Sequence, residues 1–296
     1  MKRKLLALAS LVLLTVSSLS AQIFYKIEGN GLTAPSYIFG THHLAPLSVI
    51  DEVPGCREIF KNADQVIGEI DMTINQMELA QKMQPFMIAP ADSTLSKVFT
   101  PEELKIVGEE FKKWAPMPGM TVEMLDMMRP MVVTTMISVG MVQKELPNFN
   151  PNEQLDTYFQ GDAKARGKEV KGLETPEFQA ELLYTKVPIA AQAKALLEMA
   201  KDPKDSMEKS KKLNDLYLAQ DIEGLAALSN ESAKDADEAA FMEALVDMRN
   251  ANWIKALPAL MSEKPSFIAV GALHLPGEKG VLEGLRKAGY TVTAIK

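Results

Sequence analysis

The sequence contains nearly the same short segment twice, about 230 residues apart. Residues 35–44 and 265–275 both read Pro-Ser-aromatic-Ile and then Gly-x-x-His-Leu, with one residue inserted in the second copy. Each apolar run ends at a glycine, as expected of a buried strand that leads into a tight turn. Open α/β sheets hold their ligands beyond the carboxyl ends of their strands. The repeat therefore predicts two strands of one sheet, which bring His43 and His274 to a shared site.

Six apolar segments predict the strands of this sheet, and most of them lie near the two ends of the chain. They are residues 23–28, 36–39, 65–70, 168–173, 266–270 and 290–295. Helical patterns occupy the intervening residues, with a helical insertion at about 75–165. The expected fold class is therefore α/β, or α+β with a helical insertion. It has one central mixed, partly parallel sheet formed by the N- and C-terminal segments, and a large helical middle region.

Local turn and cap signals support this arrangement. Gly-Asn-Gly at 29–31 predicts a hairpin between the first two strands. The strand-helix-strand order of residues 36–70 predicts a parallel pair of strands. Helix starts, each with a capping side chain followed by a proline, are predicted at residues 100–101, 150–151 and 175–176.

The first residues have the three-part layout of a secretory signal peptide. Three basic residues at 2–4 precede an apolar run of 12 residues, and small residues at 17–21 follow. The run is shorter than the roughly 20 residues that a helix needs to cross a bilayer. We therefore expect residues 1–21 to be a signal peptide, cleaved near Ser20 or Ala21. Residues 22–296 would form a single domain located in the periplasm or secreted.

Charge and cysteine content narrow the range of partners. Loss of the three basic residues of the signal peptide takes the formal charge from −7 to −10, and no basic cluster stands out in the mature chain. Because nucleic acids are bound by clustered positive charge, no nucleic acid is expected as a partner. A single cysteine, Cys56, can form no internal disulfide. The most apolar internal stretch, residues 131–142, is too short for a membrane span, so none is expected after cleavage.

A carboxylate is expected near the two repeated histidines. Glu69 lies at the end of the predicted strand 65–70, and so at the same sheet edge as His43. Two histidines and one carboxylate form a ligand set for zinc, manganese, cobalt or iron, and they form equally well a general base held by an acid. The spacing alone leaves both interpretations open.

Three further residues have two interpretations each. Arg249, on a predicted helix before the second repeat, is placed to stabilise an oxyanion or clamp a carboxylate, or to pair on the helix surface with Asp247 or Glu243. Glu174, also at a strand end, is a second acid or a charge at a helix start. His42 has no counterpart in the second copy, so we expect it to be a neighbour that faces away from the site.

Several segments, in chain order through essentially the whole mature chain, together resemble the TraB/PrgY/GumN family. The paired Gly-x-x-His is the most specific of them. The segments are Gly-Thr-His-His at 40–43, Gly-Glu-Ile-Asp at 68–71, Met-Arg-Pro at 128–130, Lys-Gly-Leu-Glu-Thr at 171–175, Arg-Asn at 249–250 and Val-Gly-Ala-Leu-His-Leu-Pro-Gly at 270–277. This family is similar to the Tiki metalloproteases and, more distantly, to the erythromycin esterases and the haem-associated ChaN-like proteins.

The resemblance implies a function and roles for individual residues. It implies that His43 and His274 act as the two motif histidines, Glu69 as their acidic partner and Arg249 as the arginine near the site. His43, Glu69 and His274 would hold a divalent metal, Mn, Co or Zn. We expect an exported, metal-dependent hydrolase that cleaves a peptide or ester substrate. The alternative is a non-catalytic binding protein that sequesters a peptide or small molecule, as the pheromone-shutdown branch of the family suggests.

Cleavage of the signal peptide is directly measurable. We expect the mature protein to begin at Ala21 or Gln22 and to be recovered from the soluble exported fraction, because the apolar run is short and small uncharged residues follow it. Intact-mass measurement of protein recovered from the periplasm checks this. A mass that still includes residues 1–20, or that includes a lipid, would contradict it.

Overall fold

The computed structural model describes residues 22–146, 149–150, 152–232 and 236–296. The expected signal peptide at residues 1–21 lies outside the described residues, and so does Pro151 of the expected helix start at 150–151. Within the described ranges, no helix combines the length and the apolar character that a membrane crossing requires.

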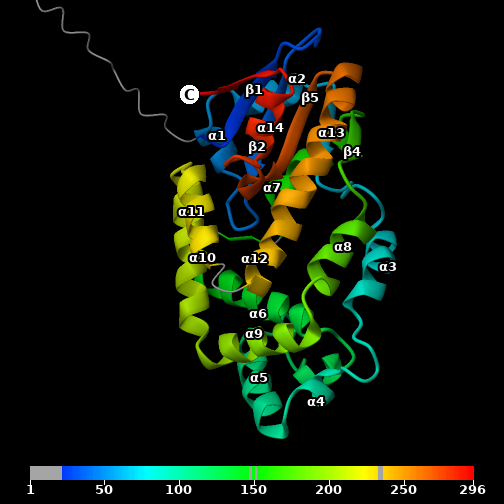
Figure 1. Cartoon of the computed structure of the whole chain (residues 1–296), viewed down its shortest axis with the longest axis vertical. Coiled ribbons are helices and arrows are strands. Elements are labelled where there is room, and N and C mark those ends of the chain that lie inside the picture. Colours follow the sequence, from blue (N-terminus) through cyan, green and yellow to red (C-terminus); the bar gives the residue numbers. More distant parts are fainter. Residues whose placement is uncertain (1–21, 147–148, 151, 233–235) are drawn as a thin grey trace, which may run out of the picture.

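All six predicted strands are present, and they form one mixed sheet at one end of the molecule (Figure 1). Four neighbouring strands run parallel, β1 beside them is antiparallel, and the edge strand β6 is antiparallel to β1 and so runs in the direction of the four. The expected fold class is therefore confirmed. In spatial order the strands are β4 (Glu169–Gly172), β3 (Gln65–Gly68), β5 (Ser266–Gly271), β2 (Ser36–Thr41), β1 (Phe24–Glu28) and β6 (Thr291–Ala294).

The two repeated segments are direct neighbours in this sheet. β2 and β5 pair in parallel, with Tyr37 opposite Phe267 and Ile38 opposite Ile268. The residue inserted in the second copy then shifts the motifs, so that Thr41 rather than Gly40 lies opposite Gly271. The predicted hairpin is also present, because β1 and β2 are antiparallel and Gly29, Asn30 and Gly31 all have positive φ.

The parallel strands β2 and β3 are not paired with each other, contrary to expectation. They are connected through α1 (Val49–Glu52) and α2 (Cys56–Asn62), but β5 lies between them and pairs with both. A local strand-helix-strand pattern fixes the relative direction of two strands, whereas a strand from far along the chain can still insert between them.

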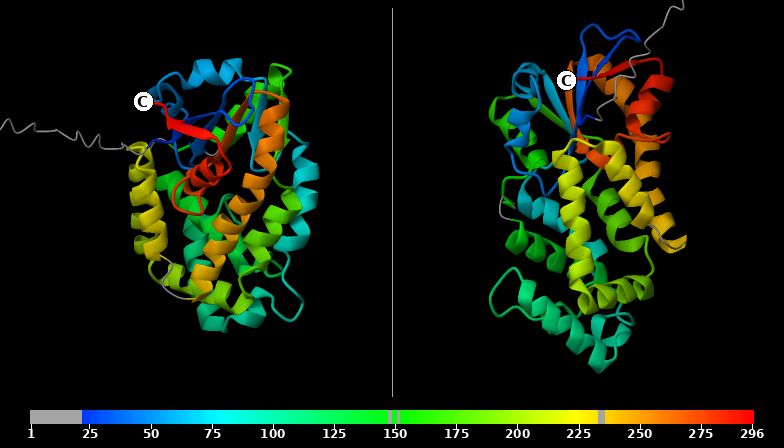
Figure 2. Two further views of the ribbon diagram at one scale, coloured as in Figure 1. Left: turned by 45° about the horizontal axis from the view of Figure 1, so that its top comes forward. Right: turned by 90° about the vertical axis from the view of Figure 1, so that its left-hand side faces the viewer.

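Helices fill the chain between β3 and β4 and between β4 and β5, and Figure 2 shows most of them gathered below the sheet. The first group is α3 (Gln76–Met87), α4 (Leu95–Val98), α5 (Pro101–Trp114), η1 (Val122–Leu125), α6 (Pro130–Glu145) and α7 (Leu155–Ala165). The second group is α8 (Pro176–Thr185), α9 (Ile189–Lys201), α10 (Pro203–Leu218), α11 (Ile222–Ser232), α12 (Ala236–Met242), the π-helical turn η2 (Glu243–Asp247) and α13 (Met248–Glu263). The short turn η3 (Ala272–His274) and α14 (Val281–Lys287) follow β5.

Two of the three predicted helix starts are found as expected. Thr100 and Glu103 form a capping box at the start of α5, and the Thr175 side chain accepts the Phe178 N–H at the start of α8. The third differs, because α7 begins only at Leu155. The Asn150 side chain accepts the Asn152 N–H in a local turn, so the capping group is used before the helix begins.

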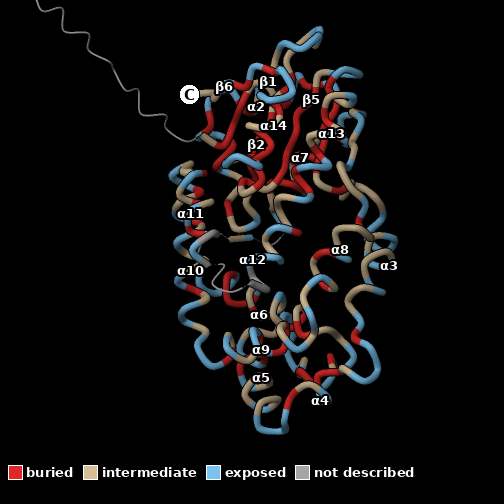
Figure 3. Tube along the Cα trace, in the orientation of Figure 1, coloured by how far each residue is buried: buried red, intermediate tan, exposed pale blue. Residues whose placement is uncertain are grey.

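The main core lies against the sheet, where Figure 3 shows the most continuous burial. Phe267 of β5 has no exposed surface, and its ring lies 4.7 to 6.2 Å from the rings of four other phenylalanines. These four are Phe24, Phe39, Phe60 and Phe159. Because Phe39 and Phe159 lie on β2 and α7, this cluster fixes the layer from which site residues project.

Phe267→Ala should lower the free energy of unfolding by roughly 3–5 kcal/mol, because it leaves a cavity inside the aromatic cluster. Met124→Ala is the matched control: that side chain is 71% exposed, and the expected change is below about 0.5 kcal/mol. Urea unfolding followed by circular dichroism measures both. Equal effects for the two variants would show that Phe267 is not part of the stabilising core.

Candidate functional site

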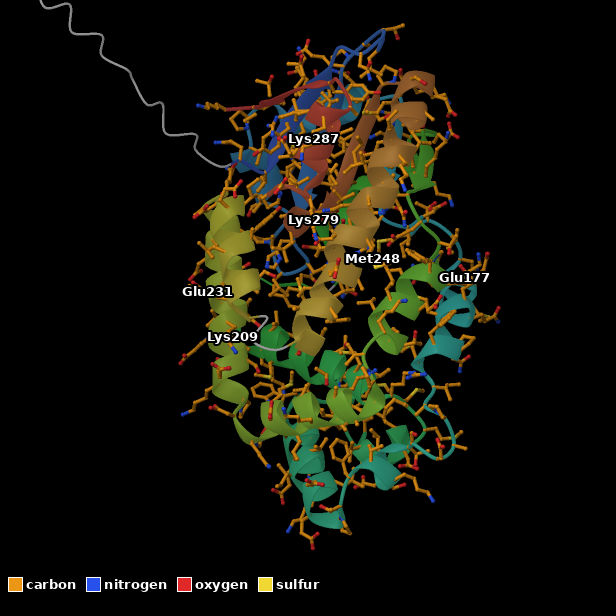
Figure 4. The ribbon with its side chains drawn as sticks, in the orientation of Figure 1. Glu177, Lys209, Glu231, Met248, Lys279 and Lys287 are labelled. Atoms are coloured by element: carbon orange, nitrogen blue, oxygen red, sulfur yellow. The ribbon has the colours of Figure 1, made fainter. Side chains whose placement is uncertain are left out.

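A cavity of about 640 Å³ lies beyond the carboxyl ends of β2, β3 and β5. All four residues predicted for the site line it: His43, Glu69, Arg249 and His274. Its other walls come from α8, α10, α11, α12 and η2, and Glu177 on α8 and Lys209 on α10 are labelled on opposite sides of the helical region in Figure 4. The strand ends therefore contribute the polar floor, and the helical region encloses it.

Glu69 follows β3 and reaches across to the end of β5. Its Oε1 accepts the Gly271 N–H at 2.9 Å and lies 3.8 Å from Nε2 of His274. A Cβ at position 271 would lie 3.2 Å from this oxygen, closer than an ordinary contact, so the absence of a side chain at Gly271 lets the carboxylate approach the backbone.

Arg249 is the centre of a buried cluster, although a surface ion pair was one expectation for it. The residue is 5% exposed, and Asp247 pairs with Lys279 instead. Nη2 of Arg249 donates to Glu69 and to Glu174, at 2.6 Å in each case. These two acids follow neighbouring strands, β3 and β4. The guanidinium therefore joins two strand ends.

The remaining donors of Arg249 are also satisfied within the protein. Nε donates to Glu174 at 3.0 Å, and Nη1 contacts the Leu245 carbonyl and Nε2 of His274 at 3.1 Å each. Arginine has five N–H donors, so none is left for a substrate oxyanion. The expected oxyanion role does not fit this geometry, because Arg249 instead positions the acids and His274.

His274 is held as a neutral imidazole. Nδ1 lies 2.7 Å from Oδ1 of Asn250, whose amide nitrogen donates to the Lys279 carbonyl. Nδ1 must therefore donate to Asn250, which leaves Nε2 as the acceptor for Arg249. Burial lowers the pKa of His274 to about 4; Glu69 opposes this shift and Arg249 adds to it. Both ring nitrogens are thus occupied.

Glu69 remains ionised in this setting. Burial by itself would raise its pKa, but the charges of His274, when protonated, and of Arg249, together with the Gly271 N–H, lower the pKa to about 2. The Gln179 amide supports the same group, because it donates to Glu69 at 3.0 Å and to Glu174 at 3.1 Å.

His43 lies in the same cavity but has a different partner. Its side chain is 73% exposed, and Nδ1 lies 3.5 Å from Oδ2 of Asp156 on α7. The Thr41 hydroxyl donates to the other carboxylate oxygen at 2.8 Å. Burial raises the pKa of Asp156, while His43 and the Thr41 hydrogen bond act in the opposite direction. The arrangement is an exposed imidazole beside a buried acid.

The two motif histidines are therefore not equivalent, and the inserted residue is the physical reason. At matching positions of the paired strands, Thr41 offers a side chain to Asp156, whereas Gly271 offers its backbone N–H to Glu69. β5 then continues into η3, which buries His274. The prediction that Glu69 lies near His274 is confirmed, whereas no hydrogen bond or ion pair joins Glu69 to His43 among the described residues.

His42 does not face away from the site, contrary to expectation. It lines the cavity, and its ring lies 5.1 Å from the ring of Tyr217. Burial, and to a smaller extent His43, lowers the pKa of His42 to about 4. Its Nε2 is buried and has no hydrogen-bond partner among the residues that the structure describes.

The expected metal ligands do not fit a metal ion in this arrangement. Both oxygens of Glu69 and Nε2 of His274 already contact hydrogen-bond donors, and His43 lies with Asp156 instead. Among the residues that the structure describes, no group of three or more histidine, cysteine, aspartate or glutamate side chains is placed to hold a metal.

Sequence reasoning missed Asp156, Gln179 and Trp253, and it gave Asn250 no role although Arg-Asn at 249–250 is one of the family segments. The sequence does contain a signal for Asp156, because it lies between the apolar residues Leu155 and Phe159 on a helix. An acidic residue on a buried helix face is rare unless its charge is paired. Trp253, one turn after Arg249 on α13, donates to Glu174 at 3.2 Å and its ring lies 4.2 Å from that of His274. No local sequence pattern identifies Trp253 as a residue of the site.

Folding stability should fall as the pH drops from about 6.5 toward 4. His42 and His274 have a pKa near 4 in the folded protein against an ordinary 6.5, so the unfolded chain takes up their protons first. The stabilisation is complete above pH 6.5, and at least about 2 kcal/mol is lost by pH 4.5. Urea titrations between pH 7.5 and 4.5 measure it, with His42→Phe expected to reduce the slope. A flat profile contradicts the burial of these neutral imidazoles.

Comparison with known proteins identifies the family of this chain. A curated relative from Amphimedon queenslandica, named Metalloprotease TIKI homolog, is 23% identical over an alignment 346 positions long, which covers 98% of this chain and 67% of the relative. No solved structure matches the chain at a significant level. The family model described as TraB/PrgY/gumN family matches residues 23–294. The chain therefore belongs to the TraB/PrgY/gumN family.

Proposed function

We propose that this chain is an exported hydrolase that cleaves a peptide or ester bond in the cavity, with His43 as its general base. The observation that carries the proposal is the pair formed by His43 and Asp156, in which an exposed imidazole at the cavity lies 3.5 Å from a buried carboxylate. A base oriented by a buried acid is a recurrent arrangement in hydrolytic sites. Export is supported by the signal-peptide layout of residues 1–21.

The chemistry assigned to this pair needs only water and the substrate. Asp156 faces Nδ1 of His43 and favours the tautomer that leaves Nε2 free to accept a proton. A water molecule gives a proton to Nε2 and attacks the carbonyl carbon. When the tetrahedral adduct collapses, the scissile amide or ester bond breaks, and the leaving nitrogen or oxygen takes the proton back from His43.

The walls of the cavity support a substrate with an apolar group next to the scissile bond. Opposite the polar floor, the cavity is lined by leucines of α8, α10, α11 and η2 and by Phe241 of α12. Apolar pockets with a few polar groups orient their ligands through those polar groups. The leucines are Leu183, Leu213, Leu225, Leu228 and Leu245. We assign this wall to an apolar acyl chain or peptide side chain.

A binding protein without turnover is the second candidate. The observation that favours it is the complete use of the Arg249 donors inside the protein, since acyl transfer commonly relies on free donors for the oxyanion. In this function the same apolar wall would hold a peptide, and His43 would contact it without activating water.

His43→Ala should lower kcat/KM by about 100-fold or more, because it removes the general base. Asp156→Asn should lower it by about tenfold or more and shift the pH profile, because the imidazole loses its acidic partner. The matched control is Asp162→Asn on the same helix, which lies on the surface and pairs with Arg166. The assays are hydrolysis of nitrophenyl esters with apolar acyl groups and digestion of a peptide library followed by mass spectrometry.

Two outcomes contradict the proposal. Full activity of His43→Ala would mean that another group is the base. Tight binding of library peptides by the wild type, with no turnover of either substrate set, would establish the binding function instead.

A further inference from the structure

The buried cluster around Arg249 contains the residue types that usually bind a divalent metal. Glu69, Glu174 and His274 converge on one point from the ends of β3, β4 and β5. Two carboxylates and an imidazole are a frequent donor set for zinc, manganese or iron. At this point, however, lies the guanidinium, with Nη2 2.6 Å from each acid and Nη1 3.1 Å from the imidazole.

Further hydrogen bonds hold each of these three side chains, as they do around metal ligands. Asn250 contacts Nδ1 of His274, Trp253 contacts Glu174, and the Gly271 N–H contacts Glu69. In metal sites such partners fix the ligand orientation and the imidazole tautomer. The whole cluster is therefore organised around a cation.

Charge and space are both consistent with a single cation at this point. The Arg249 side chain is 6% exposed, and its guanidinium faces the carboxylates of Glu174 and Glu69, whose side chains are 6% and 18% exposed. A divalent ion needs donor atoms at about 2.0–2.2 Å, so it could reach these ligands only if the guanidinium left. Both cannot occupy the cluster, because like charges in a buried site repel strongly.

We propose that Arg249 is the permanent cation of this site, and that Glu69, Glu174 and His274 bind a divalent metal only when the guanidinium is removed. The native cluster then needs no metal, and the three strand ends are held together by a side chain whose charge does not depend on metal supply or pH. The inference concerns the site of the proposed hydrolase, but its test reads metal binding and unfolding rather than turnover. A failure of this inference can therefore be distinguished from a failure of the proposed hydrolase function.

The first test uses the wild-type mature protein. After dialysis against EDTA, its melting temperature should be unchanged, and additions of Mn²⁺, Co²⁺ or Zn²⁺ should produce neither a stoichiometric calorimetric signal nor a higher melting temperature. Tight binding of one ion per chain, abolished by Glu69→Ala and by His274→Ala, would overturn the proposal. This test does not depend on whether any Arg249 variant folds.

The second test uses Arg249→Ala, with Arg249→Gln in its place if the alanine variant does not fold. Without metal, the melting temperature should fall by roughly 10 °C, because two buried carboxylates lose their partner. Zn²⁺ should recover most of that loss, and Co²⁺ should add visible absorption bands of a bound ion. Adding His274→Ala to the variant should abolish both effects.

Arg57→Ala is the matched control, because Arg57 also pairs with a carboxylate, Asp51, but at the surface. We expect neither a large loss of stability nor a metal response from it. If the Arg249 variants are as insensitive to metal as Arg57→Ala, then Glu69, Glu174 and His274 are not a latent metal site, and the proposal is wrong.

Discussion

The buried ion cluster of Arg249 is the interaction on which the rest of the site depends. It joins the ends of three parallel strands to α13, and its charged groups are largely shielded from solvent, with side-chain exposures of 6% for Arg249 and Glu174 and 18% for Glu69. Removing one partner of a buried pair commonly costs about 3–5 kcal/mol, because the remaining charge stays uncompensated. The cost of breaking the cluster thus favours one relative position of the strand ends that form the cavity floor.

The two motif histidines have different partners and different exposure because of a single inserted residue. His274 lies inside the cluster as a neutral, fully hydrogen-bonded ring, whereas His43 lies exposed beside Asp156. One copy of the repeat is therefore part of the buried framework, and the other presents an exposed imidazole to the cavity. A duplicated motif does not imply duplicated roles, since a shift of one residue along a paired strand changes which groups each copy offers.

Family membership and the local geometry answer different questions. Membership in the TraB/PrgY/gumN family identifies what the chain is related to. The reaction, however, depends on which groups have free lone pairs or N–H donors. Here the imidazole of His43 is exposed, while the donors of Arg249 are fully used within the protein. We therefore place the chemistry at the His43 side of the cavity and the structural support at the His274 side.

The sequence by itself determined the six strands, the hairpin, two helix caps and the proximity of Glu69 to His274, because periodicity, glycines and capping residues act over short distances. Only the tertiary structure decided that β5 inserts between β2 and β3, and that Asp156 rather than Glu69 faces His43. It also decided that Arg249 occupies the point where Glu69, Glu174 and His274 converge. These outcomes depend on packing between segments more than 70 residues apart, for which no local pattern encodes the partner.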